Sequence, residues 1–142
     1  MKHFTLDELL HSQAAVRHGI RNDPDKAALA NLHALVEHVL DPLREALGRP
    51  VVVSSGYRSP RVNRAVGGSA SSQHVLGQAA DITVPGMSVA DVVAKIRALR
   101  LPFDQLIDEF GRWVHVSYGP RHRRQVLRAR RTAAGTKYEA LP

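Results

Sequence analysis

The sequence contains no cysteine, few aromatic residues and no long apolar run. The absence of cysteine excludes disulfides and thiolate metal sites, so any bound metal ion must be held by imidazole and carboxylate groups. No apolar stretch approaches the roughly 20 residues of a membrane-spanning helix, so we expect no membrane insertion. The first residues, MKHFTLDELLHSQ, include acidic side chains where a secretion signal needs an unbroken apolar core. We therefore expect synthesis in the cytoplasm without a signal peptide.

Acidic residues are also in short supply, with 13 Asp and Glu against 20 Lys and Arg. Much of the basic excess lies in RHRRQVLRARR. Such a segment either attracts polyanions, such as nucleic acid or a cell-wall polymer, or is a solvated helix face or tail with no partner. With aromatics at 5% and no recognisable nucleic-acid-binding module, we do not expect nucleic acid as the partner. The length favours one domain, residues 1–120, with a basic C-terminal extension, 121–142, and we expect a monomer.

Helical patterns dominate the first third of the chain. The capping-box spacing of TLDE predicts a first helix beginning after Thr5. Asp23, followed by a proline, predicts the start of a longer helix that Gly48 ends. Pro42 interrupts the apolar period of this helix, so we expect a kink or break near residue 41.

Strand patterns follow, separated by one further helix that Ser88 begins. The predicted strands are residues 51–54, 80–84, 105–110 and 113–118. A long loop rich in Gly, Ser and Pro follows the first strand, and the last two form a hairpin turning at Gly111 and Arg112. The predicted fold is α+β, with N-terminal helices packed on a small, mostly antiparallel sheet.

Three possible metal ligands occur in the second half of the chain. His74 ends the long loop, Asp81 opens a predicted strand, and His115 lies on the last strand. Each alone has an ordinary explanation, as a surface histidine, a turn-forming aspartate or a half-buried strand histidine. Together they form the set of two imidazoles and one carboxylate that catalytic zinc uses, with a fourth position for water or substrate.

The stretch SQHVLGQAAD, residues 72–81, resembles the S-x-H-x-x-G-x-A-x-D signature of M15 zinc peptidases, which include D-Ala-D-Ala carboxypeptidases, dipeptidases and phage endolysins. The likeness extends over FTLDELLHSQAAVRHGIRNDP, SSGYRSPRVNRAVGGSASSQH and FDQLIDEFGRWVHVSY, to about residue 118. It implies the fold shared by D-Ala-D-Ala peptidases and the hedgehog domain. It also implies Zn2+ held by His74, Asp81 and His115.

The general base is less directly indicated. Many M15 enzymes carry an acidic residue three positions before the last histidine, where this chain has Arg112. A two-residue hairpin turn would pair Asp108 with His115, whereas a three-residue turn or bulge would bring Glu109 beside the metal. Glu109 lies six positions before His115, a spacing similar to that of the hedgehog domain. We favour Glu109 as the base, with Asp108 as the alternative.

Four further residues are candidates for contact with substrate. Arg58 lies in a segment where M15 peptidases use an arginine to hold substrate, and its guanidinium can clamp a carboxylate or stabilise an oxyanion. The signature implies that Ser72 fixes the loop or contacts substrate. Gln73 is a candidate contact or a loop residue with no role, and Trp113 a candidate contact or a pocket-wall aromatic.

The resemblance implies a zinc metallopeptidase that hydrolyses peptide bonds in peptidoglycan stem peptides, as a D-Ala-D-Ala carboxypeptidase or an L,D-endopeptidase. A phage endolysin, a tail lysin and a bacterial enzyme all fit. The alternative is a non-catalytic, zinc-containing module that binds the cell wall or a protein, which the missing acid at Arg112 allows. The sequence leaves open whether a D-Ala-D-Ala, an L-Ala-D-Glu or a cross-bridge bond is cut. Without a signal peptide, we expect access to the wall by holin-type release, from a virion or after lysis.

Overall fold

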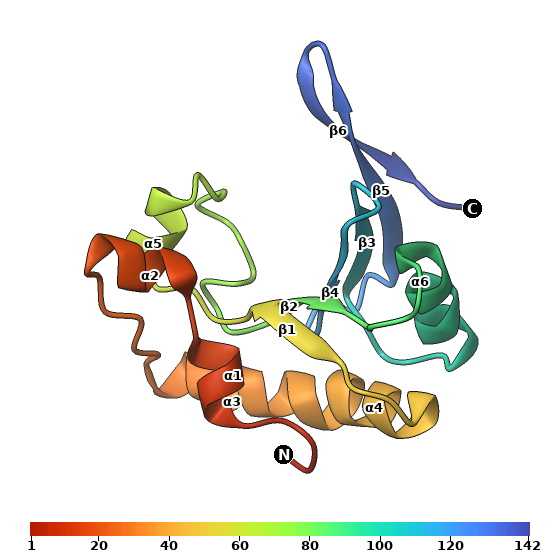
Figure 1. The fold of residues 1–142 in the computed structure, drawn as a ribbon, viewed down its shortest axis with the longest axis horizontal. Helices are drawn as coiled ribbons and strands as arrows, with labels where there is room; N and C mark the ends of the chain where they lie inside the picture. The colour runs from red at the N-terminus through yellow and green to blue at the C-terminus, as the bar shows by residue number, and fades with distance from the viewer.

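A six-stranded sheet carries the functional half of the protein, and the computed structural model describes all residues, 1–142 (Figure 1). The strands are β1 (Val52–Ser55), β2 (Ala79–Thr83), β3 (Gln105–Glu109), β4 (Trp113–Ser117), β5 (Gln125–Thr132) and β6 (Gly135–Ala140). Their order is β1-β2-β4-β3-β5-β6, and every neighbouring pair is antiparallel except β3 and β5. The expected α+β class with a mostly antiparallel sheet is confirmed.

Six α-helices and one π-helical segment accompany the sheet. They are α1 (Leu6–Leu10), α2 (Gln13–His18), α3 (Lys26–Leu35), the π-helical η1 (Val36–Leu40), α4 (Asp41–Leu47), α5 (Pro60–Ala65) and α6 (Val89–Ala98). None of them is both long and apolar enough to cross a membrane.

Helix α1 begins where the sequence predicts. The longer helix predicted to begin at Asp23 is α3, and it begins two residues later than predicted. The Thr5 hydroxyl accepts a hydrogen bond from the backbone N–H of Glu8, whose carboxylate accepts one from the backbone of Thr5. For α3 the N-cap is Asp25, whose carboxylate accepts a hydrogen bond from the N–H three residues on, at 2.8 Å. The prediction of Asp23 was wrong: its carboxylate accepts a hydrogen bond from the guanidinium of Arg21 at 2.7 Å and does not cap the helix.

Pro42 does not break the helix that contains it. The backbone stays helical from Lys26 to Leu47, and the segment before the proline widens into η1, where the Asp41 N–H bonds to the Val36 carbonyl five residues earlier. Proline has no N–H to donate to the fourth residue before it, and a π turn absorbs that missing bond without a break. The Asp41 carboxylate then accepts hydrogen bonds from the backbone of residues 2 and 3, at 2.9 and 3.0 Å.

The loop predicted after β1 contains a short helix, α5. Ser59 caps it, accepting a hydrogen bond from the N–H of Val62, and Pro60 occupies its first turn. The prediction of an uninterrupted loop was wrong because the Ser-Pro start signal stands among many Gly and Ser residues, which favour irregular structure.

The two faces of the sheet have opposite characters. Side chains on one face belong to the main hydrophobic core with α3, η1, α4 and α6, and the fully buried ones from the strands are Ala80, Ile82, Leu106, Val114 and Val116. Because side chains alternate along a strand, Asp81, His115 and Ile107 project to the other face. The helices therefore fill one side of the sheet and leave the other available for a site.

The β3–β4 connection has three residues, 110–112, which is the longer of the two turns considered and the one that the choice of Glu109 requires. Glu109 pairs with Trp113, and Ile107 pairs with His115. Phe110 and Gly111 both have positive φ, and the Asp108 carboxylate accepts a hydrogen bond from the N–H of Gly111 at 2.8 Å. This register puts Glu109 on the same face as His115, and Asp108 on the opposite face.

The basic C-terminal extension is neither a helix nor a loose tail. Strand β5 pairs in parallel with β3, and β6 folds back on β5 to form a hairpin that extends away from α3 and α4 (Figure 1). The buried carboxylate of Asp104 fixes the connection into β5. It accepts three hydrogen bonds from Arg123, one from the backbone and two from the guanidinium, each of 2.9 Å.

Candidate metal centre

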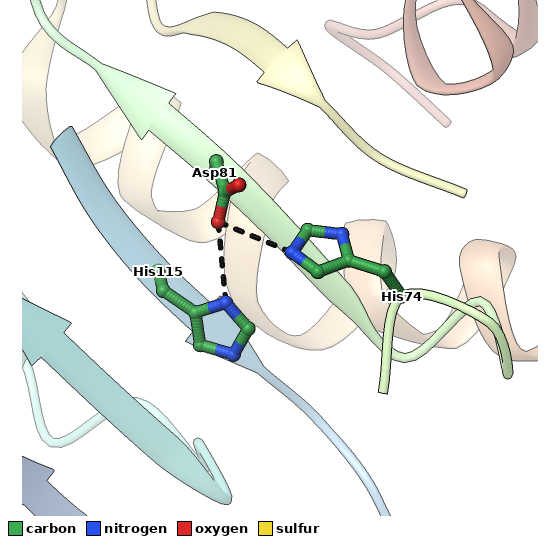
Figure 2. A group of neighbouring side chains, drawn as sticks. All are labelled: His74, Asp81 and His115. Carbon is green, nitrogen blue, oxygen red and sulfur yellow. Dashed lines mark hydrogen bonds and ion pairs between the residues drawn. The ribbon is translucent and has the colours of Figure 1, made fainter. Parts of the chain in front are cut away.

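His74, Asp81 and His115 come together on the open face of the sheet. Asp81, in the middle of β2 where we expected the start of a strand, pairs with His115 on β4, and His74 reaches them from the turn before β2 (Figure 2). The Asp81 Oδ1 atom lies 3.2 Å from His74 Nε2 and 3.2 Å from His115 Nδ1. One ligand atom from each residue lies within 4.8 Å of the others. The three residues are therefore positioned to bind a metal ion.

The hydrogen bonding of His74 fits a metal ligand. Its Nδ1 lies 2.6 Å from the carbonyl oxygen of Gly56, which only accepts, so Nδ1 carries the proton and donates. The residue is 2% exposed, and this burial lowers the pKa of His74 against the opposing charge of Asp81. In the neutral ring the Nε2 lone pair faces the carboxylate of Asp81. The lone pairs of His74 Nε2 and of the Asp81 carboxylate therefore face each other, an arrangement that a cation bound between them would stabilise. The hydrogen bond from Nδ1 to Gly56 fixes the orientation of the ring, as is usual for a histidine that binds a metal.

Asp81 supplies the negative charge of the centre. Burial alone would raise the pKa of Asp81, but the neighbouring imidazoles of His74 and His115 lower it well below its ordinary value. The carboxylate is therefore ionised at neutral pH. Its other oxygen lies 3.7 Å from the guanidinium of Arg58.

The turn that carries His74 requires its glycine. Gly77 has φ of +72°, and a Cβ added there would overlap the backbone carbonyl oxygen of Ala28 on α3. Ser72 also shapes the turn, because its hydroxyl accepts a hydrogen bond from the backbone N–H of His74 at 3.2 Å. Gly77 thus lets the turn pack against α3 while His74 and Asp81 face the same point.

Glu109 lies on the metal side of the sheet, 9% exposed, and lines the same cavity as the three ligands. Burial raises the pKa of Glu109; Asp81 adds to this shift, whereas His115 and Arg58 oppose it. Asp108 does not line the cavity, and its carboxylate is engaged by the hairpin turn. The geometry thus favours Glu109 over Asp108 as the base, and its catalytic role stays a prediction.

A cavity of about 700 Å³ surrounds the ligands. It is lined by all four residues predicted to contact substrate, namely Arg58, Ser72, Gln73 and Trp113. Sequence reasoning missed the far wall, which comes from β3 and the C-terminal extension: Gln105, Ile107, Arg121, Arg123, Gln125, Leu127 and Tyr138. No local pattern signals this wall, because it depends on the pairing of β5 with β3.

Arg58 is held in place by its neighbours. Its Nε donates to the hydroxyl of Ser55 at 3.2 Å, and its Nη1 donates to the side-chain oxygen of Asn63 at 3.1 Å. Burial lowers the pKa of Arg58, and the charges of Asp81 and Glu109 oppose this shift. A guanidinium stays protonated under such conditions, so Arg58 places a fixed positive charge beside the metal centre.

Gln73 connects the metal turn to the rest of the sheet. Its amide nitrogen donates to the Asp104 carboxylate at 2.9 Å and to the side-chain oxygen of Gln78 at 3.2 Å. Its side-chain oxygen, Oε1, is buried and has no hydrogen-bond partner in the protein. Trp113 packs edge-to-face on Phe110, with ring centroids 5.8 Å apart.

The α+β fold and its His–Asp–His triad define a protein built around a metal centre. Residues 2–117 match the model of the family described as Peptidase M15, so the chain belongs to that family. A stretch of 58 residues is 43% identical to the zinc D-Ala-D-Ala carboxypeptidase of Streptomyces albus G. This match covers 39% of the chain and 23% of that protein.

The family match confirms the resemblance inferred from SQHVLGQAAD and supports a metallopeptidase. The expected zinc cofactor agrees with the name of this relative and with the geometry of the triad. The match to the family ends at residue 117, so β5 and β6 lie outside it.

Proposed function

We propose that this protein is a zinc-dependent peptidase that hydrolyses peptide bonds in peptidoglycan stem peptides. The observation that carries the proposal is the convergence of His74, Asp81 and His115 with Glu109 on one face of the sheet, inside a cavity. Membership of the Peptidase M15 family and the likeness to a zinc D-Ala-D-Ala carboxypeptidase support the same chemistry.

His74, Asp81 and His115 would hold the zinc ion, which would supply a nucleophilic water by lowering the pKa of that water toward neutral. The Glu109 carboxylate accepts the proton of this water and delivers it to the nitrogen of the leaving amine. Burial prepares Glu109 for this task, because a raised pKa brings the carboxyl closer to the neutral range in which it must both accept and donate.

Arg58 provides the positive charge for the substrate. Its position beside Asp81, fixed by Ser55 and Asn63, lets the guanidinium bind the peptide's carboxylate or the oxyanion that forms during hydrolysis. Ser72 and Gln73 line the cavity beside it and are proposed to contact the peptide. Trp113 forms part of the wall on the Glu109 side.

Within this function we favour cleavage of a terminal D-Ala-D-Ala bond, on the strength of the relative's name. Cleavage of an L-Ala-D-Glu or cross-bridge bond is the competing specificity. An endolysin-type role, with access to the wall by holin-type release, from a virion or after lysis, is part of the same proposal.

The decisive experiment compares Glu109→Gln with Asp108→Asn on defined muropeptides, with products weighed by mass spectrometry and zinc measured per chain. We expect Glu109→Gln to keep zinc and lose about 10²–10⁴-fold in kcat. Asp108→Asn keeps an acceptor for the hairpin turn and serves as the matched control, with turnover close to that of the parent protein.

Full activity of Glu109→Gln would refute its assignment as the base. Stoichiometric zinc without release of any fragment from any muropeptide would instead favour the non-catalytic binding module.

A further inference from the structure

A row of four residues crosses the open face of the sheet beside the metal centre. Trp113 on β4 pairs with Glu109 on β3, Glu109 pairs with Ala129 on β5, and Ala129 pairs with Tyr138 on β6. Directly paired residues project to the same face of a sheet. Tyr138 therefore stands on the same face as Glu109, two strand spacings of about 4.8 Å away.

Only a small residue separates Tyr138 from Glu109. Ala129 has a single methyl group and is fully buried, so the space above β5 is left to its larger neighbours. Both Tyr138 and Glu109 line the cavity of the metal centre. The phenol thus borders the same space as the proposed base, although it lies 29 positions further along the chain.

The next row along the same face forms an apolar floor. His115 on β4 pairs with Ile107 on β3, and Ile107 pairs with Leu127 on β5. Both apolar side chains line the cavity between the metal centre and the C-terminal hairpin. Beyond them, Gln105 donates to the side chain of Gln125 at 2.7 Å, which closes the floor with a polar pair.

Tyr138 is a large aromatic residue that stays exposed to solvent. It is 54% exposed, and its hydroxyl group has no hydrogen-bond partner in the protein. Partial burial, followed by the charges of Glu109 and Asp81, raises the pKa of Tyr138, so the phenol keeps its proton and can donate. An aromatic side chain of this kind, beside a cavity with a polar end and an apolar floor, is typical of a ligand contact.

We propose that Tyr138 is a substrate-positioning residue, and that its hydroxyl donates a hydrogen bond to a carbonyl or carboxylate oxygen of a peptide lying over Ile107 and Leu127. This inference rests on the proposed peptidase function and adds to it a binding subsite made by the C-terminal extension. The subsite lies outside the part of the chain that matches the Peptidase M15 family, residues 2–117.

Tyr138→Phe tests the proposal, because it removes only the hydroxyl and keeps the aromatic ring. A neutral hydrogen bond contributes roughly 0.5–1.5 kcal/mol, so we expect KM for a muropeptide to rise about three- to tenfold while kcat stays within about twofold. Zinc content and the thermal unfolding midpoint should not change. Lys137→Ala is the matched control, since its neighbouring side chain projects from the opposite face of β6 and is 63% exposed.

Calorimetric titration of the same muropeptide into zinc-loaded Glu109→Gln, with and without Tyr138→Phe, measures binding separately from turnover. A similar three- to tenfold loss of affinity on removal of the hydroxyl supports the proposal. Unchanged KM and affinity in Tyr138→Phe would overturn the subsite and leave the peptidase function standing. Parent protein that neither cleaves nor binds any muropeptide would overturn both.

Discussion

Replacement of Gly77 by alanine should disturb the metal turn more than its size suggests. The residue has φ of +72°, and an added Cβ would overlap the Ala28 carbonyl oxygen. Both parties to this overlap belong to the backbone, so no side chain can rotate away to relieve it. The turn must therefore move away from α3, and His74 and Asp81, which flank it, must move with it.

The expected cost has two parts. An alanine in left-handed backbone loses about 1–2 kcal/mol, and an overlap in a packed region costs about 1–3 kcal/mol. Gly77→Ala should therefore lower the free energy of unfolding by about 2–5 kcal/mol. Gly19→Ala is the matched control, because Gly19 has a similar φ of +62° and open space around the position of its Cβ. It should lose only the first part.

Urea unfolding followed by circular dichroism, with and without zinc, measures both variants. We expect Gly77→Ala to bind zinc more weakly as well as to unfold at lower urea, whereas Gly19→Ala should keep the zinc affinity of the parent protein. Equal losses of stability in the two variants would refute the argument from close packing between the turn and α3.

Two further predictions concern charge and metal. Hydrogen bonds from Arg123 hold the pKa of Asp104 at about 2 against an ordinary 3.8, so its stabilisation is complete above about pH 4 and is lost as the pH falls toward 2. The parent protein should lose about 2 kcal/mol more than Asp104→Asn over this range in acid unfolding, and parallel pH profiles would contradict this. Removal of zinc by a chelator should lower the thermal unfolding midpoint, and zinc at 100 times its Kd should restore about 2.7 kcal/mol. His74→Ala should show no zinc-dependent shift, and a shift equal to that of the parent protein would exclude His74 as a ligand.

The sequence predicts most of what local chemistry decides. The Thr5 cap, the helix begun by Ser88 and the ending at Gly48 each depend on a few neighbouring residues, and all three are confirmed. The convergence of the three candidate metal ligands could be predicted because one short motif contains two of them and β4 presents the third with a clear alternation.

The errors arise where distant or competing interactions decide. The length of the hairpin turn stayed open at the level of the sequence because Phe110 adopts positive φ, which its residue type does not indicate. Strand β5 was not predicted because it contains three arginines, Arg128, Arg130 and Arg131, which gave the segment the character of a basic tail. Its pairing with β3 is also not local in the sequence. That pairing is also what brings Tyr138 to the cavity, so the far wall of the site could not be found from the sequence.

The carboxylate of Asp104 connects the C-terminal hairpin to the turn that carries His74. It binds Arg123 at the base of the C-terminal hairpin and Gln73, the residue immediately before the ligand His74. A peptide that shifts the hairpin must therefore also change the hydrogen bonding of the metal turn. By thermodynamic reciprocity, zinc and peptide should then alter each other's affinity by the same factor. One buried acid would make metal loading and substrate binding a single coupled equilibrium.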